Sequence, residues 1–162
     1  MKNKSLFVKP PYRKRCVFKN LDWLFYQVKA FFQRGKNGYS GFDLANLDYY
    51  LTHILAHSLK DFGMNTNQVP YRFLEMFDNE YDALDCWRNY VIEMAQHFYN
   101  SMEENKNEVM PNKYEKYFMR CKSNHSMKKK YLEEESRIYT WQKEERNKGF
   151  EMLTEAFDNL WD

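Results

Sequence analysis

The sequence predicts an all-α protein: a helical bundle with a long C-terminal helix and a basic, partly extended N-terminal arm. Three observations favour this fold class. The 162 residues include only five glycines and four prolines, and few are β-branched. Strands favour β-branched residues, so their scarcity favours helices. The 13 Phe, 13 Tyr and 4 Trp offer ample surface for a core, and no apolar run is long enough to span a membrane. We therefore expect no helix that spans a membrane, and the predicted partners do not include a membrane.

The basic residues are concentrated at the N-terminus. Residues 1–20 carry seven basic side chains and no acid, which leaves −5 for residues 21–162 in a chain of net charge +2. We therefore divide the chain into a basic arm, 1–20, and a single helical domain, 21–162. This asymmetry favours an anionic partner, such as a nucleic acid, a nucleotide, a membrane surface or an acidic protein face. A solvated tail explains such a charge run equally well.

The first helix is predicted over about 21–34. Asn20 is a suitable N-cap, and Gly35 stands where a left-handed residue would end the helix. Its apolar positions form a face wider than one stripe. The helix therefore lies at the centre of the core or against another subunit.

A glycine-rich loop and the most regular helix follow. The stretch 34–41 holds three of the five glycines, and Asn37-Gly38 favours a positive φ and a tight turn. The second helix is predicted over about 43–62, capped by Asp43 and ended by Gly63. Its leucines recur at spacings of three and four residues along one face.

The rest of the chain predicts one further regular helix and one long one. The third helix covers about 79–101, capped by Asp78, and short helical turns are expected at 71–77 and 114–121. From 126 to 160 runs a long helical pattern that Gly149 interrupts, and its middle is polar almost all round. Such a segment is typical of a helix that projects from the body or lies across a partner subunit.

Few residues are spaced as catalysis or metal binding would need. His53 and His57 share one helix face, as do Glu93 and His97, but a histidine beside an apolar stripe is more often a core residue than a ligand. The sequence has no Gly-x-Ser-x-Gly motif, and its three cysteines are scattered as expected for reduced thiols. We predict no catalytic residue, no metal and no cofactor, and therefore not an enzyme.

Binding of a nucleotide-like anion is better supported. Arginine binds phosphate with two parallel hydrogen bonds, and aromatic rings stack on bases. Basic and aromatic residues that stand together in the arm and in the glycine-rich loop form the predicted ligand-binding set: Tyr12, Arg13, Arg15, Arg34, Lys36 and Tyr39. The loop is not a Walker A motif, because no Ser or Thr follows Lys36. An ordinary connection between helices remains the alternative.

Several motifs together resemble a small protein family that tailed phages encode widely. They are Arg34-Gly35-x-x-Gly38-Tyr39-Ser40-x-x-Asp43-Leu44-x-Asn46-Leu47-Asp48-Tyr49-x-Leu51, then Val69-Pro70, Trp87-x-x-x-Val91-Ile92-x-Met94-Ala95-x-x-Phe98, and Phe157-x-x-Leu160-Trp161-Asp162. The resemblance covers about 34–162. Gly41 and Ala45 depart from it, since an acid and an aromatic residue are usual at these two positions.

The resemblance implies a function in immune evasion. The family is similar to phage anti-CBASS sponge proteins, which bind cyclic oligonucleotide signals of the host without cleaving them. It implies a viral protein of the host cytoplasm, a cyclic di- or trinucleotide ligand, and a homo-oligomer, either a dimer or a tetramer. The alternative is a helical adaptor that binds a host protein or a nucleic acid through its basic N-terminal arm.

Overall fold

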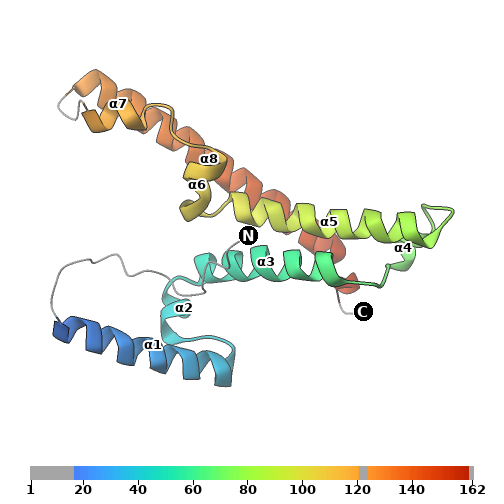
Figure 1. Ribbon diagram of the computed structural model, residues 1–162. Coiled ribbons are helices and arrows are strands. Elements are labelled where there is room, and N and C mark those ends of the chain that lie inside the picture. Colours follow the sequence, from blue (N-terminus) through green and yellow to red (C-terminus); the bar gives the residue numbers. More distant parts are fainter. Residues whose placement is uncertain (1–16, 121–123, 161–162) are drawn as a thin grey trace. The chain divides into compact units, whose positions relative to one another are not determined.

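The computed structural model describes residues 17–120 and 124–160, and all regular structure within these ranges is helical (Figure 1). The all-α prediction is therefore confirmed for them. The chain separates into two compact units, 1–46 and 47–162, which are described one at a time. Most of the predicted arm lies outside the described residues, and the first helix begins at Val17. The predicted boundary at residue 20 stays a prediction.

The N-terminal unit consists of α1 (Val17–Asn37) and α2 (Gly41–Ala45). α1 continues through Gly35, so the predicted end at that residue is wrong. The left-handed residue is Gly38, with φ of 80°, and its N–H donates to the Arg34 carbonyl at 2.9 Å. A residue with a side chain would be strained in this conformation, which explains why the turn contains glycine here.

The second predicted helix is divided in two. Ser40 is the N-cap of α2, and Asp43 is the third residue of a capping box rather than the cap itself. α3 (Leu47–Asn65) begins after a break at Asn46, whose φ of −134° and ψ of 50° are not helical. It then passes through Gly63 instead of ending there, because this glycine lies against α5. A Cβ at Gly63 would approach the Arg88 carbonyl oxygen to 3.2 Å.

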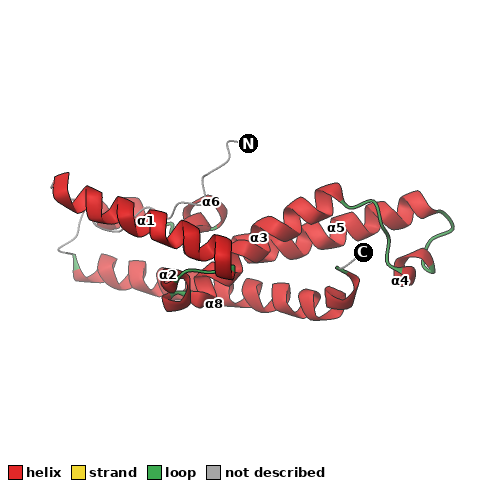
Figure 2. Cartoon of the chain, turned by 90° about the horizontal axis from the view of Figure 1, so that it is seen from below, coloured by secondary structure: helices red, strands yellow, loops and turns green. Residues whose placement is uncertain are grey.

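Three long helices form the second unit. α3 packs antiparallel to α5 (Glu80–Asn100), and α5 in turn packs antiparallel to α8 (His125–Ala156), as Figures 1 and 2 show. The N-cap of α5 is Asn79, one residue later than predicted. α4 (Tyr71–Leu74) connects α3 to α5. Between α5 and α8 lie η1 (Glu103–Asn105), α6 (Lys106–Val109) and α7 (Glu115–Arg120), and η2 (Phe157–Asn159) follows α8.

The core lies mainly on α5, the central helix. Its fully buried side chains include Trp87, Val91, Met94 and Phe98. The Trp87 ring contacts the Phe73 ring of α4, with centroids 5.2 Å apart. α5 therefore joins α3, α4 and α8 into one packed unit.

The polar middle of α8 packs within the chain rather than projecting from it. Glu134, Gln142 and Glu145 are all buried on the face toward the rest of the unit. Each has a partner: Glu134 accepts from Arg137 at 2.8 Å, and Gln142 donates to the Met102 carbonyl at 3.1 Å. Buried polar groups are tolerated when they are hydrogen-bonded, so a polar helix can be internal. No helix within the described ranges is long and apolar enough to cross a membrane.

Candidate functional site

The predicted loop site has Arg34 as its central cation, and the structure shows what this side chain contacts. The Arg34 Nε donates to Asp43 Oδ2 at 2.7 Å, and its Nη2 donates to Asp43 Oδ1. Ser40 donates to the same carboxylate from its backbone N–H and from its hydroxyl, both at 2.7 Å. Burial alone would raise the pKa of Asp43. The hydrogen bonds from Arg34 and Ser40 have the larger, opposite effect, so the pKa of Asp43 lies below its ordinary value.

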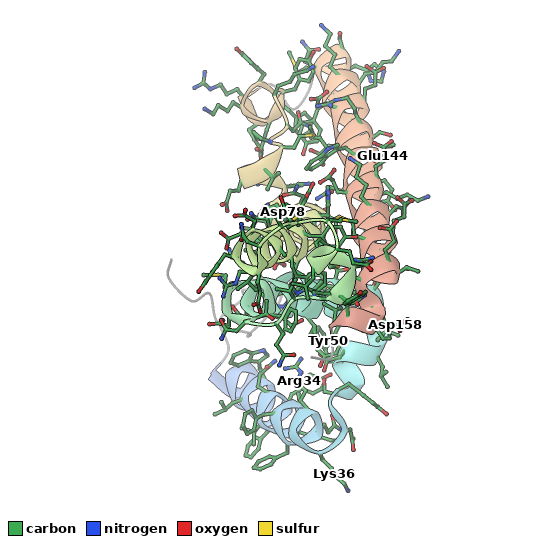
Figure 3. All side chains as sticks on the ribbon, turned by 90° about the vertical axis from the view of Figure 1, so that its right-hand side faces the viewer. Arg34, Lys36, Tyr50, Asp78, Glu144 and Asp158 are labelled. Atoms are coloured by element: carbon green, nitrogen blue, oxygen red, sulfur yellow. The ribbon has the colours of Figure 1, made fainter. Side chains whose placement is uncertain are left out.

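The Arg34 guanidinium therefore links the end of α1 to α2. Lys36 and Tyr39 are exposed beside this link, and Figure 3 shows Lys36 at the end of α1. The structure thus brings these three predicted residues to one end of the N-terminal unit, while a role in phosphate binding stays a prediction. Tyr12, Arg13 and Arg15 lie outside the described residues.

Replacing Asp43 by alanine is expected to loosen this end of the unit. The change leaves the donors of Arg34 and Ser40 without their carboxylate, and a capping interaction contributes about 0.5–2 kcal/mol. We expect the amides of residues 38–45 to exchange with deuterium about twofold to thirtyfold faster, as this free energy corresponds to. Asp61→Ala, at an exposed position of α3, is the matched control and should leave these amides unchanged. Unchanged exchange in Asp43→Ala would show that the capping box is not what orders this turn.

A second candidate site lies in the larger unit, where α3, the end of α5 and α8 meet. It is a cavity of about 150 Å³. Its lining consists of Asp48, Tyr49 and Thr52 from α3, Ser101, Met102 and Glu103 around the end of α5, and Tyr139, Gln142, Lys143 and Arg146 from α8. The sequence prediction included none of these residues.

The polar groups in the cavity wall are largely engaged with the backbone. The Thr52 hydroxyl donates to the Asp48 carbonyl at 2.7 Å, and the Ser101 hydroxyl donates to the Phe98 carbonyl at 2.8 Å. The buried Gln142 amide donates to the Met102 carbonyl, which joins α8 to the end of α5. These contacts fix the wall and engage both hydroxyl protons with backbone carbonyls.

Two cations of α8 stand out in the lining. Within the described residues, neither Lys143 nor Arg146 forms an ion pair. Of the two acids in the cavity lining, Asp48 and Glu103, the second pairs with Lys106 at 2.8 Å. The cavity therefore has cationic groups available to an anion.

Tyrosine side chains accompany these cations. Tyr139 is 63% exposed, and Tyr49 is half-buried with its hydroxyl donating to Glu104. Burial, together with the Glu104 carboxylate, raises the pKa of Tyr49 well above its ordinary value, so the phenol stays protonated and neutral. One exposed and one partly covered phenol ring thus lie in the lining that holds Lys143 and Arg146.

A buried carboxylate fixes the register of α8 next to this cavity. Glu145 accepts from the His97 ring Nδ1 and from the Asn100 amide, each at 2.9 Å, and from Lys148 Nζ at 3.0 Å. Burial raises the pKa of Glu145, but the hydrogen bonds from Asn100, His97 and Lys148 outweigh it, and the net pKa is lowered. This network crosses from α5 to α8 and holds Arg146 at its position.

Acid is expected to weaken the α5–α8 contact. Folding lowers the pKa of Glu145 from its unfolded value, near 4.5. Such a carboxyl group stabilises the folded protein fully at pH values above the unfolded pKa. This stabilisation is lost as the pH falls through the pKa of the folded state. We expect the free energy of unfolding to decline from pH 5 to 3, measured by urea denaturation, and Glu145→Gln to flatten that decline. Glu144→Gln, at the exposed neighbour labelled in Figure 3, should leave it unchanged. Equal declines in all three proteins would contradict this account.

The histidines do not assemble a metal site within the described ranges. The rings of His53 and His57 lie together, with centroids 4.5 Å apart, whereas His97 contacts Glu145 and, at 4.0 Å, Glu93. No group of three or more His, Cys, Asp or Glu side chains in the described part of the chain could hold a metal ion.

A spacing in the sequence could have indicated the cavity. Tyr139, Lys143 and Arg146 follow one another at intervals of four and three residues, so they share one face of α8. That signal was lost in a segment that is polar almost all round. Comparison of the chain with protein-family models, with curated proteins and with solved structures finds no match. The resemblance to a phage family therefore stays a prediction.

Proposed function

We propose that this chain is a binding protein that captures an anionic nucleotide without transforming it, in the manner of a phage sponge for host cyclic oligonucleotides. One observation carries the proposal: the cavity between α3, α5 and α8 presents two tyrosines together with two cations that form no ion pair within the described part of the chain. A cyclic oligonucleotide requires the same combination, because it carries phosphates between stackable bases.

The cations have distinct roles in this proposal. The Arg146 guanidinium binds a phosphate with two parallel hydrogen bonds, while Lys143 acts as a point charge beside it. The exposed Tyr139 ring offers a stacking surface for a base. Because the hydroxyls of Thr52 and Ser101 donate to backbone carbonyls, the cavity supports binding better than nucleophilic attack.

The size of the cavity limits what one copy encloses. Sites that enclose a whole small ligand usually measure about 300–1,000 Å³. At about 150 Å³, this cavity accommodates a phosphate and part of the attached sugar. The remainder of a cyclic dinucleotide lies outside it, where a second copy of the chain is proposed to cover it.

Equilibrium dialysis against a panel of cyclic di- and trinucleotides tests the proposal. We expect one member to be retained at micromolar protein and to be recovered unchanged, by mass spectrometry, after the complex is denatured with heat. Absence of retention for every member would contradict nucleotide capture. Recovery of a linear or hydrolysed product would contradict capture without transformation.

The adaptor alternative is favoured by a different observation, the seven basic side chains and no acid of residues 1–20. Deletion of residues 1–19 separates the two functions. Intact nucleotide affinity with loss of binding to a protein or a duplex supports the adaptor, and a steep fall of that binding with salt indicates contact with many phosphates.

A further inference from the structure

α1 presents an apolar face with nothing packed on it among the described residues. The face consists of Leu24, Phe25, Val28, Phe31 and Phe32, which recur at the spacing of one helix side. The three phenylalanines are 66–70% exposed. By contrast, Ala30 on another side of the helix is buried. Lys29 and Lys36 follow Phe25 and Phe32 by one turn each, so they border the face.

The charge of the chain divides at the boundary between the two units. Residues 1–46 carry a net charge of +8 and residues 47–162 a net charge of −6. The apolar face is bordered by Lys29 and Lys36 within a described stretch, 17–46, of net charge +2, so it brings like charges together when it meets an identical face on another copy. It is attracted instead to an acidic surface that also offers apolar side chains.

Such a surface exists on the second unit, and we name it the acidic corner, residues 71–85. Its exposed apolar side chains include Tyr71, Met76 and Tyr81, which are 70–83% exposed. Its acids are Glu75, Asp78, Glu80, Asp82 and Asp85. Glu80 and Asp82 lie in the first turn of α5, where negative side chains interact favourably with the helix dipole. Glu75 and Asp78 lie outside that turn, so the helix dipole does not explain them.

The acidic corner is exposed yet firmly anchored. Phe73 is buried against Trp87, and the Arg72 guanidinium lies over the Phe73 ring and donates to the Glu155 carbonyl at 3.1 Å. The Asn79 side chain accepts from the Asp82 N–H at 2.8 Å and caps α5. A surface held in this way loses little conformational freedom when a partner covers it.

We infer that the apolar face of α1 docks on the acidic corner of a second copy of this chain. Lys29 and Lys36 then meet acids such as Glu75 and Asp78, while the phenylalanines cover Tyr71, Met76 and Tyr81. When both copies exchange α1 in the same way, the contact is reciprocal and closes as a two-fold dimer.

The available area fits a reciprocal exchange. An aromatic side chain removes about 150–250 Å² from water when fully buried, so the α1 face offers about 500 Å². A single face docked on a single corner buries about 1,000 Å² in total, at the low end for stable complexes. Two reciprocal contacts bury about 2,000 Å², as stable dimers do.

Sedimentation velocity of the full chain, at micromolar concentration and moderate salt, tests this assembly. The wild type should sediment at twice the 20.0 kDa mass of one chain. Phe25→Ser/Phe32→Ser and, separately, Met76→Ser/Tyr81→Ser should each raise the dimer dissociation constant at least about a hundredfold. Because all four side chains are exposed, helical content by circular dichroism should be unchanged. Leu132→Ser/Tyr117→Ser, at exposed apolar positions outside both surfaces, should dimerise like the wild type.

Mixing identifies the partner surface. A 1:1 mixture of the Phe25→Ser/Phe32→Ser and Met76→Ser/Tyr81→Ser variants retains one intact contact and should form heterodimers more readily than either variant alone. A monomeric wild type would overturn the inference, whether α1 docks within its own chain or on a lipid surface. Dimers that survive Met76→Ser/Tyr81→Ser would overturn it as well, because they would show that the acidic corner is not the surface on which α1 docks.

Discussion

Replacing both Lys143 and Arg146 by methionine is expected to weaken binding of a cyclic dinucleotide by about 100-fold to 10,000-fold. Each substitution removes a charged hydrogen-bond partner of the phosphate, worth about 1.5–3 kcal/mol, and about 1.4 kcal/mol corresponds to a factor of ten. Methionine is a good helix former, so α8 should persist. Isothermal titration of both proteins at the same salt concentration measures the change in affinity.

The control must lower the net charge equally without touching the cavity. Lys116→Met/Lys130→Met removes two exposed cations of α7 and α8, neither of which forms an ion pair within the described residues. It should change the affinity less than threefold. A similar loss in both double variants would show that the ligand responds to the overall charge of the protein rather than to Lys143 and Arg146.

Gly149→Val is expected to lower the free energy of unfolding by about 2–3 kcal/mol. A Cβ at Gly149 would lie 3.1 Å from two atoms of the Phe98 ring. That ring has no exposed surface and packs edge-on against Phe150, with centroids 5.1 Å apart, so it cannot move aside without disturbing the core. Urea denaturation followed by circular dichroism measures the loss.

Two further variants isolate the cause. Gly35→Val places the same side chain in α1, where a Cβ would meet nothing within 4 Å, and should change stability by less than about 0.5 kcal/mol. Phe98→Leu in the Gly149→Val background shortens the opposing side chain and should recover part of the loss. Equal stability of Gly149→Val and the wild type would show that the close approach of the Phe98 ring does not require glycine at position 149.

Glycines show why the helices could be predicted better than their contacts. An isolated glycine within a helical pattern indicates a stop or an interruption, and this interpretation failed at Gly63 and Gly149. At both positions the helix continues. Because glycine has no side chain, it leaves space for a residue of α5 that is distant in sequence. The pattern of a single helix contains no information on what lies across from it, whereas the apolar periodicity that predicted the helices is local.

Capping shows the same limit at shorter range. Ser40 and Asp43 stand three residues apart, which is the spacing of a capping box, and the predicted cap, Asp43, is the third residue of that box. Arg34 is bound to Asp43, and this contact spans nine residues that include a turn. From the sequence alone, a basic residue near glycines resembles a phosphate ligand. The structure shows that Arg34 already binds the carboxylate of Asp43.

The spacing of Tyr139, Lys143 and Arg146 does not by itself single out the candidate site, for a related reason. Lys143 and Arg146 are notable because they form no ion pair within the described residues, whereas Arg137 and Lys148 of the same helix each pair with a buried glutamate. Glu134 and Glu145 become buried only because Lys113, His97 and Asn100 reach them from other elements. Which charges are neutralised is decided by tertiary packing, and the remaining cations become visible only afterwards.

Hydrogen–deuterium exchange of the wild-type chain, with and without the nucleotide retained in dialysis, tests the central claim most directly. The account predicts slower exchange in three segments that meet at the cavity, residues 47–52, 101–104 and 139–146. Protection confined to residues 34–46, around Arg34, Lys36 and Tyr39, would instead place the ligand at the glycine-rich loop and contradict the assignment of the cavity.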